Sequence, residues 1–127
     1  MWDTHGDNFK RLKRRLWPVF GHAMSALLQD LDDRGTLEET LVVVLTDFGR
    51  TPRINAGAGR DHYPHVYSIA FAGGGTEGGQ VYGSSDANGA FPRTHACGPA
   101  DVHATIFQML GTRHELSWLI CWDGLFP

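Results

Sequence analysis

Residues 40–50 read TLVVVLTDFGR, a continuous run of apolar and β-branched residues that ends in an acid, a glycine and an arginine. Because polar residues bound this run on both sides, it predicts a strand over 40–46 that is buried on both faces. Strands of this kind belong to sheets that are covered by helices. The segment therefore predicts an α/β fold.

Helices and further strands are predicted on both sides of this run. Apolar residues recur at three- and four-residue steps after residue 9, which predicts a helix broken near Pro18 into pieces at 8–16 and 18–33 and ended by Gly35. The patterns predict three more elements: strands at 65–72 and 80–82, and a helix from Pro99 to Leu110. So few strands cannot form a sheet covered on both faces, and we expect neighbouring strands from elsewhere.

Composition and charge limit the classes of partner. The 127 residues are 42% hydrophobic and 20% charged, which is typical of one globular domain and not of disordered or fibrous protein. A net charge of −3 provides no field that would gather nucleic acid or an anionic membrane, and the basic run at 10–15 is interpreted as a solvated helix face. No apolar run approaches the roughly 18 to 20 residues of a membrane helix. We expect neither nucleic acid nor membrane as a partner, and no export signal is visible.

The first candidate for chemistry lies at the start of the chain. Asp3 and His5 are two residues apart, so on an extended chain end both side chains point to the same face, as a pair of metal ligands does. A carboxylate together with neutral imidazole suits zinc, manganese or iron better than calcium. The alternative is that both residues are solvated or form a local turn.

Two further segments place polar groups where sites are often built. Asp47 stands at the carboxyl end of the predicted strand, where ligands bind in open α/β sheets, and Arg50 offers a planar fork for phosphate or sulfate. The alternatives are a turn residue and a surface ion pair. The loop at 60–65 contains His62, a candidate ligand or acid/base group, with His65 in reserve, although a lone histidine is often structural.

Taken together, these segments resemble the carboxyl-terminal part of an uncharacterised sulfatase-like family, domain of unknown function 1501. The resemblance rests on 2–9 (WDTHGDNF), 41–52 (LVVVLTDFGRTP), 59–64 (GRDHYP), the glycine-rich stretch 72–83 and the helix start 99–105. It covers about residues 2–112, and the motifs are specific only in combination. The family resembles the alkaline phosphatase and sulfatase superfamily, whose members cleave phosphate or sulfate esters with one or two metal ions and an activated nucleophile.

The resemblance implies metal-assisted hydrolysis of a small anionic phosphate or sulfate ester by the parent protein. It implies a divalent cation (zinc, manganese or calcium), the metal ligands Asp3, His5, Asp47 and His62, and the substrate-binding residues Arg50 and Arg60. Superfamily phosphatases commonly carry histidine directly after the strand-end acid, where this chain has Phe48. This departure removes one expected ligand of a second metal ion, and Arg50 would take over part of that ion's role by neutralising substrate charge. The sequence leaves the number of metal ions open.

The superfamily takes its nucleophile from an earlier strand, and no serine of this sequence stands in a nucleophile-elbow context. We therefore expect residues 1–127 to be a single, incomplete carboxyl-terminal part of a larger domain. It would hold a partial alkaline-phosphatase-like sheet flanked by helices, and it would be inactive in isolation. Such a piece would associate through an exposed sheet edge.

The alternative is a non-catalytic module that binds an anion or pairs with a polypeptide supplying the missing strands. The apolar stretch at 116–126 either packs on the sheet or promotes association. Localisation stays open, because proteins resembling this family often carry export signals.

Overall fold

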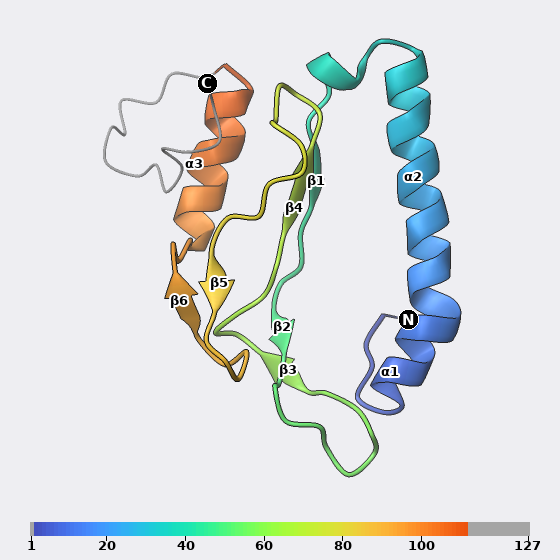
Figure 1. Cartoon of the computed structure of the whole chain (residues 1–127), viewed down its shortest axis with the longest axis vertical. Helices are drawn as coiled ribbons and strands as arrows, with labels where there is room; N and C mark the ends of the chain where they lie inside the picture. The colour runs from blue at the N-terminus through green and yellow to red at the C-terminus, as the bar shows by residue number, and fades with distance from the viewer. Residues whose placement is uncertain (1, 112–127) are drawn as a thin grey trace.

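The fold is seen in a computed structural model of the chain, which describes residues 2–111. Helix α2 and helix α3 lie on opposite sides of a ribbon formed by short strands (Figure 1). The elements in order are α1 (Asn8–Arg11), the π-helical turn η1 (Leu12–Leu16), α2 (Trp17–Asp33), the 3-10 turn η2 (Leu37–Glu39), β1 (Val42–Val44), β2 (Gly49–Arg50), β3 (His62–Tyr63), β4 (Ala70–Ala72), β5 (Ser84–Ser85), β6 (Pro92–Thr94) and α3 (Pro99–Met109). The predicted α/β class is confirmed.

The long amino-terminal helix follows its sequence pattern closely. The break predicted near Pro18 is a π-helical turn, η1, placed directly before α2, so that Pro18 lies in the first turn of α2. This placement suits proline, because its missing N–H would be unpaired there in any case. Helix α2 ends where predicted: Gly35 has a φ of 67°, and Thr36 N donates to Leu31 O at 2.9 Å.

The strands are shorter than predicted, and each pairs with a single neighbour among residues 2–111. Strand β1 pairs antiparallel with β4, β2 with β3, and β5 with β6. The strand predicted over 40–46 is three residues long and half-buried rather than buried on both faces. Of 65–72 only the last three residues form a strand, 80–82 forms none, and no sequence pattern indicated the β5–β6 hairpin. A strand extends only as far as a neighbouring strand pairs with it. The periodicity of one segment does not indicate which segment will pair with it, so it does not predict the length of the strand.

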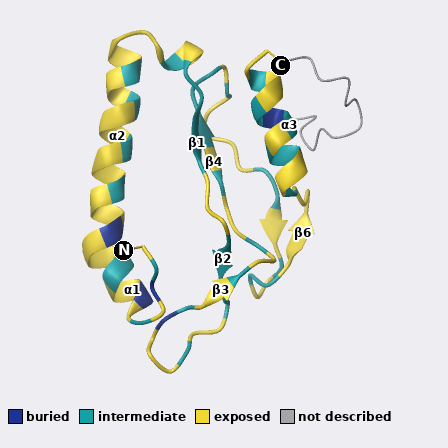
Figure 2. Cartoon of the chain, turned by 180° about the vertical axis from the view of Figure 1, so that it is seen from behind, coloured by how far each residue is buried: buried dark blue, intermediate teal, exposed yellow. Residues whose placement is uncertain are grey.

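Little apolar surface is buried within the described residues. Leu16 is the one buried apolar side chain there, and no residue of α2 is buried (Figure 2). The least exposed residues of α2 still follow the predicted stripe: Phe20, Met24, Leu28 and Leu31. The other buried residues include Thr4, Asn8 and Gly59, which lie where the start of the chain meets the β2–β3 loop.

Two further points complete the description. Between residues 2 and 111, no helix has the combination of length and apolar character that crossing a bilayer requires. The apolar stretch predicted at 116–126 lies outside the described residues.

Candidate metal centre

The start of the chain is joined to the β2–β3 loop by backbone hydrogen bonds. These run from Asp7 N to Gly57 O and from Asn8 N to Ala58 O, at 2.9 Å each, and from Arg60 N to Thr4 O at 3.3 Å. The buried side chains of Thr4 and Asn8 hydrogen-bond each other on the inner side of this junction. Backbone segments about fifty residues apart are therefore held in one register.

Asn55 organises the loop from inside. Its Oδ1 accepts from the amides of Gly57 and Gly59 at 3.0 and 2.9 Å, and its Nδ2 donates to the His5 carbonyl at 3.0 Å. Gly59 is buried against this carbonyl, and its backbone leaves no room for a side chain. A loop that reads as polar and glycine-rich in the sequence thus becomes a support for His5.

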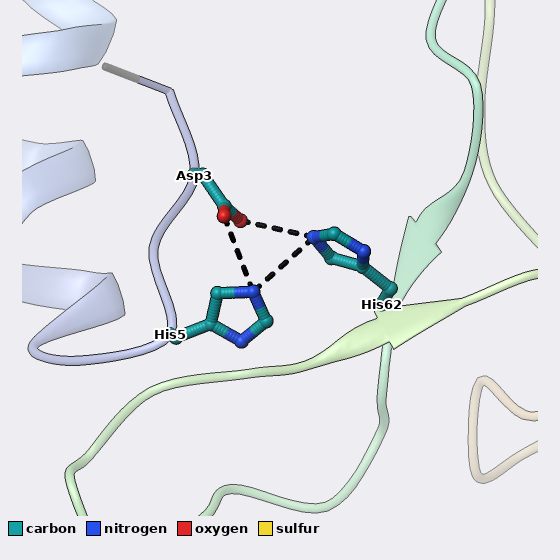
Figure 3. Close-up of side chains that lie close together, drawn as sticks. All are labelled: Asp3, His5 and His62. Carbon is teal, nitrogen blue, oxygen red and sulfur yellow. Dashed lines mark hydrogen bonds and ion pairs between the residues drawn. The ribbon is translucent and has the colours of Figure 1, made fainter.

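Three side chains converge above this junction (Figure 3). Asp3 and His5 come from the first residues of the chain, and His62 comes from β3. The Nε2 atom of His5 lies 3.2 Å from Asp3 Oδ2 and 3.2 Å from His62 Nε2, and His62 Nε2 lies 3.1 Å from Asp3 Oδ1. All three side chains are 37–48% exposed, so a small ion can reach them from solvent.

The chemistry and spacing of these donors fit a transition-metal ion. Two ligands at the usual distance from tetrahedral zinc lie about 3.3 Å apart, close to the separations found here. Each of the two facing Nε2 atoms offers a lone pair when its ring carries the proton on Nδ1, and a cation would then contact both nitrogens and the carboxylate at once. Calcium prefers six to eight oxygen ligands, so the two nitrogen donors favour zinc or manganese.

Arg50 holds the aspartate of this group. Its guanidinium donates to Asp3 Oδ1 at 2.6 Å and to the Arg60 carbonyl at 3.0 Å. The hydrogen bond from Arg50, followed by that with His62, lowers the pKa of Asp3 from 3.8 to about 2. Asp3 is therefore a carboxylate at neutral pH, ready to bind a cation.

A second carboxylate, that of Asp61, contacts His5 on the side of the ring away from the three-residue group. Asp61 Oδ1 lies 2.7 Å from His5 Nδ1, the ring nitrogen that faces away from Asp3 and His62. The hydrogen bond with His5, and then that from Asn55, lowers the pKa of Asp61. Neither Asp61 nor Asn55 was predicted as a site residue, and the one signal in the sequence was that Asp61 directly precedes a candidate ligand.

An open pocket of about 450 Å³ adjoins the group. It is lined by Trp2, Asp3, Thr46, Phe48, Arg50 and His62. The Phe48 ring stacks on the His62 imidazole with centroids 3.8 Å apart, which limits how this imidazole can turn. Phe48, the residue directly after Asp47, therefore contacts a candidate ligand through its aromatic ring.

The structure brings some of the predicted site residues together and leaves others apart. Asp3, His5 and His62 lie together, with Arg50 beside them, whereas Asp47 is exposed between β1 and β2 and does not belong to the group. Arg60 directs its guanidinium to the carbonyls of Thr51 and Arg50 within the loop. The roles of Asp47 as a ligand and of Arg60 in substrate binding stay predictions.

Comparison with known proteins gives one match. A family model described as Protein of unknown function (DUF1501) matches residues 1–118, which include every segment of the candidate metal centre. No curated protein and no solved structure matches the chain.

Proposed function

This chain belongs to the DUF1501 family, and from that premise we propose that it holds a divalent cation between Asp3, His5 and His62. We further propose that the cation serves the hydrolysis of phosphate or sulfate esters, the reaction implied by the resemblance to the alkaline phosphatase and sulfatase superfamily. One observation carries the proposal: the ligand atoms of Asp3 and His5 meet that of His62, although His62 lies 59 and 57 positions further along the chain.

A bound divalent cation supplies positive charge to the ester oxygens and makes a coordinated water more acidic. The chain's own residues hold and shape the site. Arg50 fixes the Asp3 carboxylate by a hydrogen bond and places a guanidinium in the pocket wall, next to where a phosphate or sulfate group would bind. Phe48 restricts His62 through ring stacking. The nucleophile is expected from polypeptide outside this sequence, which is why we expect the isolated chain to be inactive.

The metal site is tested first by direct binding. We expect the purified chain to bind one equivalent of zinc or manganese, and His5→Ala and His62→Ala to release it. His103→Ala serves as the control, because His103 is an exposed histidine of α3, remote from the group in sequence. Metal at one hundred times its dissociation constant should add about 2.7 kcal/mol to the free energy of unfolding. Equal metal content in all three variants would refute the site.

The substrate class is tested by anion binding. We expect the metal-loaded chain to bind inorganic phosphate or sulfate more tightly than the metal-free chain, and Arg50→Gln to reduce that binding. Glu77→Gln, a substitution in an exposed loop, is the control for effects of mutation that are unrelated to the site. Anion affinity that does not depend on metal would contradict the hydrolase proposal.

A second candidate function is a module that pairs with a strand-bearing polypeptide. Two observations on residues 2–111 favour it. Leu16 is the one buried apolar side chain in this range, and β1 pairs with one strand, β4, which leaves its other edge unpaired within the range. We expect the free chain to self-associate, and Leu45→Lys, next to β1, to reduce this because lysine blocks edge pairing. Val81→Lys is the control, since Val81 is 93% exposed in a loop. Self-association is expected of the incomplete hydrolase domain as well, so the metal titration separates the two candidates. A chain that self-associates but binds neither zinc nor manganese supports the pairing module, and a monodisperse monomer in light scattering would rule it out.

A further inference from the structure

We propose that Asp61 is a positioning residue for His5: its carboxylate accepts the proton on Nδ1 and so presents Nε2 as a metal-ligating atom. The inference rests on the proposed function, because it concerns the same site. Asp61 is not itself a ligand in this arrangement.

The geometry of the His5 ring carries the inference. Asp61 Oδ1 lies 2.7 Å from Nδ1, while Nε2 lies 3.2 Å from both Asp3 Oδ2 and His62 Nε2. A neutral imidazole carries one N–H, and an ionised carboxylate can only accept. Both ring nitrogens face a carboxylate, but the contact of Nδ1 with Asp61, at 2.7 Å, is shorter than that of Nε2 with Asp3, at 3.2 Å. The shorter contact assigns the proton to Nδ1, which leaves the Nε2 lone pair on the side of Asp3 and His62.

The carboxylate that selects this tautomer is itself held firmly. Asn55 Nδ2 donates to the same Oδ1 atom of Asp61 at 3.1 Å. The Asp61 amide donates to Thr51 Oγ1 at 3.0 Å, and the Asp61 carbonyl accepts from Thr51 N at 2.9 Å. Asn55 also binds the His5 carbonyl, so one amide side chain aligns both the histidine backbone and its partner.

Asp61 is distinguished from a fourth metal ligand by the side of the His5 ring that it contacts. The cation group gathers at Nε2, whereas Asp61 contacts Nδ1 on the far side of the imidazole. Histidine ligands commonly donate their other N–H to a carboxylate, which orients the ring and raises its basicity. Loss of such a partner typically weakens metal binding 10- to 100-fold.

The experiment combines zinc affinity with the tautomer of His5 in the full chain. Zinc affinity is measured by chelator competition for wild type, Asp61→Ala, Asp61→Asn and the control Glu77→Ala, which removes an exposed loop carboxylate. We expect Asp61→Ala to bind zinc 10- to 100-fold more weakly. Asp61→Asn should recover part of the loss, because its amide oxygen still accepts from Nδ1.

The tautomer is read from ¹⁵N shifts of the His5 ring in zinc-free protein. We expect the proton on Nδ1 in wild type and in Asp61→Asn, a readout that a purely structural role in the loop would not require. If Asp61→Ala does not fold, Asp61→Asn and the wild-type tautomer still decide the matter.

The outcomes distinguish failure of the inference alone from failure of the proposed function. If His5→Ala loses zinc but Asp61→Ala binds as tightly as Glu77→Ala, the inference is wrong and the metal site stands. A neutral His5 with its proton on Nε2 overturns the inference even when zinc binds. If wild type binds no metal, the proposed function fails and the inference fails with it, whatever the tautomer.

Discussion

The closest backbone approach in the candidate site makes Gly59→Ala the sharpest test of its architecture. A Cβ atom at residue 59 would lie 2.6 Å from Gly6 N and closer still to the carbonyl group of His5, whereas real Cβ atoms essentially never approach within 3.0 Å. The atoms in the way are backbone, so they cannot move aside by changing a rotamer. The segment that carries Asp3 and His5 must therefore shift away from the loop.

We expect this shift to reduce both stability and metal binding. Overpacking of a closed contact costs about 1–3 kcal/mol, and the hydrogen bond from Arg60 N to Thr4 O, at 3.3 Å, would be lost with about 1 kcal/mol more. Because Asp3 and His5 move relative to His62, zinc affinity should fall by roughly 10- to 100-fold, the scale at which loss of a ligand's support weakens metal binding.

The matched control lies two residues away in the same loop. A Cβ at Gly57 would meet Asn55 Oδ1 at 3.5 Å and the His5 carbonyl oxygen at 3.7 Å, which are ordinary contacts. Urea unfolding and zinc titration of the two variants, side by side, measure the difference. Equal stability and equal zinc affinity for Gly59→Ala and Gly57→Ala would refute the proposed contact between the chain start and the loop.

Three further predictions follow from other parts of the molecule. The pKa of Asp3 is lowered from 3.8 to about 2, so the stability contributed by its ionised form is present above about pH 4 and is lost as the pH falls through 2; the melting temperature of wild type should therefore drop more between pH 4 and pH 2 than that of Asp3→Asn, and parallel curves would speak against the Arg50 contact. Gly21→Ala should raise the free energy of unfolding by about 0.5–1 kcal/mol in urea denaturation, because Gly21 lies inside α2 and the added methyl group would meet no atom within 4 Å apart from its own stretch of helix; a loss of stability would show that this face of α2 is covered. Asp47→Ala should leave zinc affinity unchanged, since Asp47 lies outside the three-residue group, and a tenfold loss would instead support its predicted role as a ligand.

The helices could be predicted almost to the residue because their causes are local. The four-residue steps of Phe20, Met24 and Leu28 define one face, and Gly35 ends the helix because its positive φ is open to glycine. The strands were predicted less well. Val42–Val44 keeps only the centre of an apolar run, because a ladder extends only as far as its partner, here β4, runs beside it.

The site, like the fold, could be predicted from the sequence only in part. The spacing of Asp3 and His5, and the loop position of His62, were visible as candidates in the sequence. Asp47 looked equally good, since it follows the most apolar strand, but it is exposed and outside the group. Asp61 gave no signal beyond its place directly before His62, because the role proposed for it depends on which ring nitrogen of His5 it faces.

The sequence by itself therefore determined the α/β class, the helix limits and the residue types able to bind a cation, since these depend on periodicity and side-chain chemistry along a short stretch. Only the tertiary structure decided which candidates meet. His5 and His62 come together because the amides of Asp7 and Asn8 pair with the β2–β3 loop, and Gly59 lets the two backbones touch. Such contacts join residues about fifty positions apart, and no local pattern in either segment specifies the other.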